Sequence, residues 1–328
     1  MQLSRVQYES GSYLQSDGTE TEYRRYGKGG ELVVLVPGFS CGMDMWNCLI
    51  QNIANSEMFS FLCLENRGFG SGRCSSYRLW SNQGGYSTDT MANDVWHIVN
   101  NFSRGQVHLI GFSLGGMIVS KAASVYPERV LSLTLLSTPK CGIHILLPGW
   151  RTLKVVMRVI SHYVFLRVCP LCRHRSCNER NNHVRIFFEI YFKYSEYYLL
   201  ELTKDNSALI PRWRFIKQQQ EREKYSLPRY MSIWGQLHAI LFHRLCREEM
   251  TKIRRASFPI LCISGKYDQL VSVNGCRNFA RELNGNYIML SGAHFITEEC
   301  MEQVHQLIRL FLKKQLDCFN DISPLWVV

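Results

Sequence analysis

Short apolar runs alternate with amphipathic stretches along the first part of the chain. Runs of roughly four to eight apolar residues are typical of buried strands, whereas apolar residues three and four apart are typical of a helix. This pattern predicts an early hairpin over 12–27, helices over 46–55 and 88–102, and a last helix over 298–315. It also predicts a strand that starts at 107 and further strands over 31–36, 59–64, 131–137, 258–265 and 287–291.

The alternation stops after Lys140 and resumes at Pro259. Strands that alternate with helices favour a mostly parallel sheet with helices on both faces, because a parallel strand pair needs a crossover connection. We therefore expect an α/β core made of 1–138 and 259–328, with an insertion over 139–258. Functional groups are then expected at the carboxyl ends of the strands.

The insertion is expected to be mainly helical, with an amphipathic, basic stretch over 145–168 and an aromatic stretch over 186–202. The aromatic side chains favour a pocket for an apolar or aromatic part of a substrate. A second interpretation is that they form the insertion's own core, and both stay open.

Most of the positive charge lies in the same insertion. The chain has 328 residues and a net charge of +11, and 139–258 alone holds 22 Lys and Arg against 9 Asp and Glu, which leaves −2 elsewhere. Three interpretations stay open: a solvated face, peripheral contact with an anionic membrane surface, and recognition of an acidic substrate. Nucleic-acid binding is not expected, because no nucleic-acid-binding module is apparent.

Composition also bears on location. The first 30 residues are polar and charged, and no apolar run reaches about 18 residues, so we expect neither a signal peptide nor a membrane-spanning helix. The chain has 13 cysteines, many of them in apolar strand or helix patterns, which favours buried thiols in a reducing compartment. The expected location is cytoplasmic, with peripheral membrane contact left open.

One cysteine cluster has spacing that suits zinc. Cys169 and Cys172 form a C-x-x-C pair, and Cys177, His174 and His183 follow closely. Three thiolates and an imidazole make a complete tetrahedral ligand set. The chain lacks a second such pair, so a loop with free thiols is favoured and no metal site is predicted.

Residues 107–119 carry a candidate nucleophile. They read VHLIGFSLGGMIV, a strand pattern that meets Gly-Phe-Ser113-Leu-Gly and passes into a helical pattern. A serine on so sharp a turn needs residues without side chains two positions before it and two after it. The start of a helix offers unpaired N–H groups to a developing oxyanion. The motif resembles the nucleophile elbow of the α/β-hydrolases, which places Ser113 as the attacking group.

The resemblance implies the other members of a catalytic triad, in the family's order of serine, acid and histidine. Asp268, in the loop after the strand over 258–265, resembles the family's acid. His294, in a Gly-Ala-His loop after the strand over 287–291, resembles the family's histidine. In such a triad the histidine takes the serine's proton and the carboxylate orients the histidine.

Two further turns are similar to those of the family. Pro37 and Gly38 follow the strand over 31–36, and by resemblance the backbone N–H groups of Phe39 and Leu114 form the oxyanion hole. Residues 65–72 are similar to the family's Asp-x-Arg-Gly-x-Gly turn. Glu stands here in place of Asp, a departure that we expect to concern structure more than catalysis.

The resemblance covers about 20–138 and 257–315. It implies a mostly parallel, eight-stranded-type sheet flanked by helices, with an inserted helical cap. The expected function is a serine hydrolase that cleaves a small-molecule carboxylic ester, with a lipophilic or acyl portion, through an acyl-enzyme and without a cofactor.

Other activities stay open at this point, because the fold does not determine the substrate. A thioesterase, an amidase and a carbon–carbon bond hydrolase would share the triad. A receptor that binds a ligand and turns it over slowly, or not at all, would share it too. An epoxide hydrolase or haloalkane dehalogenase is disfavoured, because those relatives have Asp where this chain has Ser113.

Overall fold

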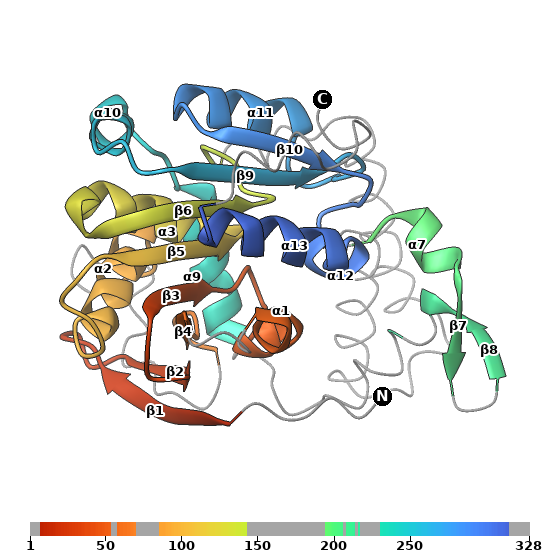
Figure 1. Ribbon diagram of the computed structural model, residues 1–328, viewed down its shortest axis with the longest axis horizontal. Coiled ribbons are helices and arrows are strands. Elements are labelled where there is room, and N and C mark those ends of the chain that lie inside the picture. Colours follow the sequence, from red (N-terminus) through yellow and green to blue (C-terminus); the bar gives the residue numbers. More distant parts are fainter. Residues whose placement is uncertain are drawn as a thin grey trace.

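The computed structural model describes residues 7–53, 58–69, 85–142, 194–205, 208–213, 216 and 230–314. Eight strands form one sheet in the order β1-β2-β4-β3-β5-β6-β9-β10 (Figure 1). Its strands are β1 (Tyr8–Leu14), β2 (Glu20–Tyr26), β3 (Glu31–Val36), β4 (Phe59–Leu64), β5 (Val107–Phe112), β6 (Val130–Leu136), β9 (Ile260–Gly265) and β10 (Asn286–Leu290). A separate hairpin pairs β7 (Leu202–Asp205) with β8 (Ala208–Pro211).

The described helices of the first half are α1 (Asn47–Ile53), α2 (Thr88–Val99) and α3 (Leu114–Val125), with short 3-10 turns η1 (Met43–Trp46) and η2 (Pro127–Arg129). Those of the second half are α7 (Glu196–Leu200), α9 (Tyr230–Leu241), α10 (Arg247–Arg255), α11 (Val273–Glu282), α12 (Ile296–Glu299) and α13 (Met301–Leu312). None of the described helices is long and apolar enough to cross a membrane.

The sheet is mostly parallel, as the sequence predicts. β1 pairs antiparallel with β2, and β2 antiparallel with β4, whereas the remaining neighbours from β4 to β10 are parallel. The predicted hairpin is formed by β1 and β2, and the other predicted strands are confirmed to within two residues.

The continuous apolar sequence of β3 reflects burial on both faces of the sheet. Leu32, Val34 and Val36 point into one hydrophobic cluster, which also contains side chains of α2, α3, α10 and α11. Val33 and Leu35 point into the other, which contains side chains of α1 and α13. Successive side chains alternate between faces, so one strand contributes to both layers of helices (Figure 1).

The order of the strands reverses at β3. The chain passes from β3 to β4 on one side and later to β5 on the other side. In open parallel sheets such a reversal leaves a crevice at the carboxyl ends of the strands, where ligands bind. The loops that follow β3, β4, β5, β9 and β10 all begin at this edge.

The predicted last helix is interrupted. Residues 298–315 were expected to form one helix, but α12 ends at Glu299 and α13 begins at Met301. Cys300 between them has a non-helical backbone, with φ −117° and ψ 35°. The Glu299 side chain bonds the Ser195 backbone and the Ala293 N–H, so the break lets α12 face the loop of His294.

The predicted insertion lies largely outside the described residues, including the stretch over 145–168. Parts of its second half are described and pack on the core. Ala239 and Ile240 of α9 and Met250 and Ile253 of α10 belong to the same cluster as α2 and α3. The division at 138 and 259, and the interpretation of 139–258 as a helical cap, stay predictions.

Replacing Leu35 by Ala is expected to lower the free energy of unfolding by about 2–5 kcal/mol, because Leu35 is fully buried at the centre of the sheet. Leu14→Ala is the matched control, since Leu14 is 69% exposed at the end of β1, and it is expected to change stability by less than about 0.5 kcal/mol. Urea denaturation followed by circular dichroism measures both. Equal losses in the two variants would contradict this account of the core.

Candidate active site

Ser113 lies on the tight turn between β5 and α3. Its backbone has φ 52° and ψ −111°, in the left-handed half of the map that non-glycine residues rarely occupy. Its N–H donates to the Leu136 carbonyl oxygen at 2.8 Å, which ties the turn to β6. The turn places the serine at the carboxyl end of β5, as the sequence motif predicts.

The glycines of the motif are required by close backbone contacts. A Cβ atom on Gly111 would lie 2.3 Å from the Gly115 carbonyl oxygen, and one on Gly115 would lie 2.1 Å from the Val36 carbonyl oxygen. A Cβ atom on Gly116 would lie 1.8 Å from Thr138 Oγ1. Strand β5, helix α3 and the end of β3 therefore approach more closely than any residue with a side chain would allow.

The three residues predicted as a triad are brought together. His294 Nε2 lies 3.0 Å from Ser113 Oγ, and His294 Nδ1 lies 2.8 Å from Asp268 Oδ2. All three side chains are withdrawn from solvent: Ser113 is 8% and His294 4% exposed, and the Asp268 side chain is 0% exposed. The distances and order are those of a serine activated through an imidazole and a carboxylate.

The carboxylate of Asp268 is held in place by its own loop. Its Oδ1 accepts hydrogen bonds from the backbone N–H groups of Leu270 at 2.8 Å and Val271 at 2.9 Å. One oxygen is therefore engaged by the backbone, and the other faces His294. This division orients the carboxylate and directs Oδ2 at the imidazole.

His294 lies in the loop after β10, and this loop is held on both sides. Ser137 Oγ donates to the His294 carbonyl oxygen at 2.9 Å. The Ala293 N–H donates to Glu299 Oε2 at 3.2 Å, and Ser195 Oγ donates to the same oxygen at 2.7 Å. Burial raises the pKa of Glu299, with a smaller contribution from the Asp268 charge.

Sequence reasoning missed Glu299. The only available signal was its position five residues after His294.

The two predicted oxyanion donors lie at the start of α3 and in the turn after β3. Leu114 is the first residue of α3, where the backbone N–H groups have no partner within the helix. Phe39 follows Gly38 at the end of β3, and a Cβ atom on Gly38 would lie 2.6 Å from Cδ1 of the Phe112 ring. The turn containing Phe39 is thus packed closely against the end of β5.

The loop after β4 supports this turn. Asn66 Nδ2 donates to the Pro37 carbonyl oxygen at 2.8 Å and to the Gly38 carbonyl oxygen at 3.3 Å. Arg67 is buried and makes a two-pronged ion pair with Asp94 on α2. The loop therefore links the β3 turn to the helix layer.

Glu65, the residue that departs from the family pattern, belongs to the same support. Its Oε1 accepts from the Met43 N–H at 2.9 Å, whereas its buried Oε2 makes no hydrogen bond with any residue that the structure describes. Burial raises the pKa of Glu65 from 4.5 to about 8, and the nearby charges of Asp44 and Glu22 add to the increase. The side chain is therefore neutral over much of the physiological pH range.

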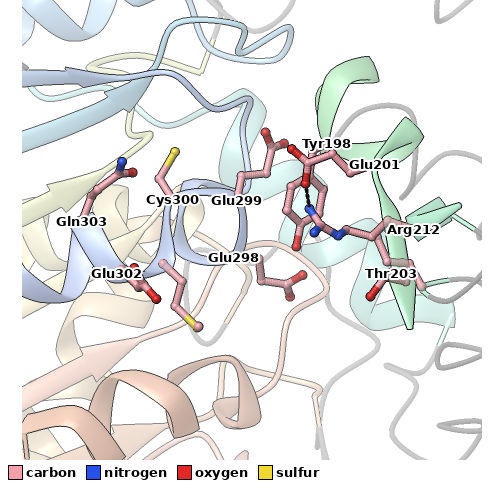
Figure 2. A pocket seen from close by; sticks show the side chains of 11 residues that line it. Tyr198, Glu201, Thr203, Arg212, Glu298, Glu299, Cys300, Glu302 and Gln303 are labelled. Atoms are coloured by element: carbon pink, nitrogen blue, oxygen red, sulfur yellow. Dashed lines mark ion pairs between the residues drawn. The ribbon is translucent and has the colours of Figure 1, made fainter. Parts of the chain in front are cut away.

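A polar cavity of about 510 Å³ lies beside α12, on the side that faces α7, β7 and β8 (Figure 2). Its described lining includes four carboxylates and Arg212, which pairs with Glu201 and lies 4.1 Å over the Tyr198 ring. None of the triad residues is among the described residues that line it. The cavity is acidic, unlike the apolar substrate pocket expected from the aromatic stretch, which stays a prediction.

Part of that aromatic stretch lies near His294. The Tyr194 ring is buried, stacks on Tyr198 at 5.5 Å, and lies 5.8 Å from the Phe295 ring, next to the histidine. Residues 186–193 of the stretch are outside the described part of the chain.

The candidate zinc ligands also lie outside the described residues; they are Cys169, Cys172, Cys177, His174 and His183. Within the described ranges, no group of three or more His, Cys, Asp or Glu residues is arranged to hold a metal ion.

Comparison with known proteins gives the same fold. Residues 31–154 match the family model described as alpha/beta hydrolase fold. A solved enol-lactonase from Burkholderia xenovorans LB400 superimposes with a TM-score of 0.66 at 16% identity, covering 92% of this chain and 100% of that one. At this identity the likeness is one of fold.

Two curated relatives each match over a little more than a third of the chain. One is the dihydrolipoyllysine-residue acetyltransferase component of the acetoin cleaving system of Cupriavidus necator, 31% identical over 37% of this chain and 30% of its own length. Another is the pimeloyl-[acyl-carrier protein] methyl ester esterase of Salmonella newport, 24% identical over 36% of this chain and 41% of its own length. The match thus spans less than half of either relative.

Replacing Glu65 by Gln is expected to flatten the pH dependence of stability. Because folding raises the pKa of Glu65, its protonated carboxyl group stabilises the native state in full below pH 4.5, the ordinary pKa of Glu. This contribution is lost as the pH rises through about 8, the pKa in the folded state. The unfolding free energy of the wild type should therefore fall relative to that of Glu65→Gln between these values, by about 1.4 kcal/mol per unit of pKa shift at most. Urea titrations at a series of pH values measure the difference, and parallel curves would contradict a raised pKa.

Proposed function

Because the chain belongs to the α/β-hydrolase superfamily, we propose that it is a serine hydrolase that cleaves carboxylic esters through Ser113, His294 and Asp268. The observation that carries the proposal is the continuous chain of hydrogen bonds, at 3.0 Å and 2.8 Å, from the serine hydroxyl to the buried carboxylate. A serine in an unusual backbone conformation, at the carboxyl edge of the sheet where its order reverses, adds support.

In the first half of the reaction, Ser113 Oγ attacks the ester carbonyl carbon while His294 Nε2 accepts its proton. The carbonyl oxygen becomes an oxyanion that accepts hydrogen bonds from the N–H groups of Phe39 and Leu114, near the positive end of α3. Asp268 stabilises the imidazolium without taking its proton. The tetrahedral intermediate then collapses, the bond to the leaving oxygen breaks, and His294 gives that oxygen the proton.

In the second half, a water molecule replaces the departed alcohol. His294 takes a proton from this water, and the resulting hydroxide attacks the acyl carbon of the acyl-enzyme. Collapse of the second tetrahedral intermediate breaks the bond to Ser113 Oγ, which recovers a proton from His294. The products are an alcohol and a carboxylic acid, and no redox cofactor or metal ion takes part in these steps.

The ester bond and the apolar substrate portion rest on two considerations. The names of two proteins to which this chain is similar, a methyl ester esterase and an enol-lactonase, refer to the hydrolysis of an ester and of a lactone, which is a cyclic ester. The apolar portion rests on the aromatic composition of 186–202, which favours a pocket for an apolar group. Tyr194 of this stretch packs on Phe295 beside His294, and both side chains are buried in the fold.

Ser113→Ala is expected to abolish both labelling by a fluorophosphonate probe and hydrolysis of p-nitrophenyl esters, because no other group would form the acyl-enzyme. Ser10→Ala, on the exposed strand β1, is the matched control and should label and turn over as the wild type does. A chain-length series of esters, run beside the corresponding thioesters, identifies the preferred bond and acyl length. Labelling of Ser113 without turnover of any ester would favour a ligand-binding receptor instead.

Asp268→Asn is expected to lower kcat by about a thousandfold to ten-thousandfold. The two backbone N–H groups that bond Oδ1 would select the amide oxygen of Asn, which leaves the NH₂ group facing His294. The imidazole would then carry its proton on Nε2 and lose its ability to accept one from Ser113. Asp44→Asn, at a side chain 65% exposed, is the control. A kcat within threefold of the wild type in Asp268→Asn would contradict the assigned acid.

A further inference from the structure

Gln236 on α9 is a fully buried polar residue that connects two loops of the candidate site. Its side-chain oxygen accepts a hydrogen bond from the Ser40 N–H at 3.0 Å. Its side-chain nitrogen donates to the Arg67 carbonyl oxygen at 3.1 Å. The residue is 0% exposed, so both ends of the amide are used where water does not compete.

Ser40 is the residue after Phe39, the proposed oxyanion donor. Its backbone has φ 53°, a left-handed conformation that costs energy in a non-glycine residue and persists only where neighbouring groups hold it. Asn66 bonds the carbonyl oxygens before Phe39, and Gln236 bonds the N–H group after it. The turn is therefore held on both sides of the donor.

Helix α9 is itself held in a defined position. A Cβ atom on Gly68, next to Arg67, would lie 2.0 Å from Ser232 Oγ, and one on Gly235 would lie 2.3 Å from the Tyr86 ring. These close approaches on both sides leave α9 little freedom to shift along the loop. The amide of Gln236 thus has a rigid base from which to position Ser40.

We infer that Gln236 is a positioning residue for the oxyanion hole: its amide holds the turn of Ser40 so that the Phe39 N–H points at the substrate oxygen. The inference rests on the proposed function and adds to it a residue from the segment between β6 and β9. Through this amide, the position of α9 determines the alignment of the oxyanion donor.

The first test is Gln236→Met, which keeps the approximate volume and removes both hydrogen bonds. Because the donor would be misaligned while the substrate site is otherwise unchanged, kcat for the preferred ester is expected to fall about 10- to 100-fold, with KM changed less than about threefold. Ala239→Gly is the control, since it destabilises the same helix at a buried position whose side chain cannot hydrogen-bond to either loop. It is expected to lower the melting temperature and leave kcat unchanged.

The second test is Gln236→Glu, which makes the contact depend on protonation. A neutral carboxyl group donates to the Arg67 carbonyl oxygen and accepts from the Ser40 N–H, as the amide does, whereas a carboxylate has no proton to donate. The ratio of variant to wild-type kcat should therefore rise as the pH falls. The described charged or titratable groups on and around α9 include Glu65, Arg67, Tyr86, Asp94 and His238. They are present in both proteins, so their contributions are common to both terms of the ratio.

The outcomes separate this inference from the proposed function. Loss of labelling and turnover in Ser113→Ala, with a full kcat in Gln236→Met, would support the hydrolase and overturn the role of Gln236. Equal kcat losses in Gln236→Met and Ala239→Gly would also overturn it, because both would then reflect stability alone. A selective loss in Gln236→Met, with a pH-dependent ratio in Gln236→Glu, supports it.

Discussion

The candidate active site depends on one backbone constraint, the close contact between the end of β5, the start of α3 and the end of β3. Gly111 and Gly115 allow this contact, since a Cβ atom at either position would lie within 2.3 Å of a carbonyl oxygen. The contact places Ser113 in a left-handed conformation, which costs about 1–3 kcal/mol, and the packed sheet offsets that cost. The strain at this position places the hydroxyl next to the start of α3, where the N–H groups have no partner within the helix.

The other groups reach this hydroxyl because parallel strands all end at the same edge. Strands β9 and β10 are neighbours, so the loops that carry Asp268 and His294 begin side by side. The loop after β4 holds the turn of Phe39 from the other side, through Asn66. Two hydrophobic clusters, one on each face of the sheet, hold the strands beneath these loops. Buried polar groups such as Glu65 instead hydrogen-bond the loops at the edge of the sheet.

The strands, and the approach of Ser113, Asp268 and His294 to one another, could be predicted from the sequence, whereas the contacts that support them could not. A strand buried on both faces has a distinctive apolar sequence, and Ser113 and Asp268 each follow such a strand within a short loop. His294 follows the partly buried edge strand β10, whose apolar residues still mark it as a strand. Gln236 and Glu299 were missed because their roles depend on contacts with residues far away in the sequence, at Ser40 and Arg67 for one and at Ser195 for the other. The break at Cys300 was missed because the helical periodicity of the sequence continues across it.

Mass spectrometry of a trapped acyl-enzyme tests the central claim most directly. The protein would be mixed with an ester that acylates rapidly and deacylates slowly, quenched in acid and digested, and the modified peptide sequenced. One acyl group, located on Ser113, is expected in the wild type, and His294→Ala is expected to gain that mass much more slowly. An acyl group on another residue, or turnover of the ester without an acyl-enzyme, would contradict it.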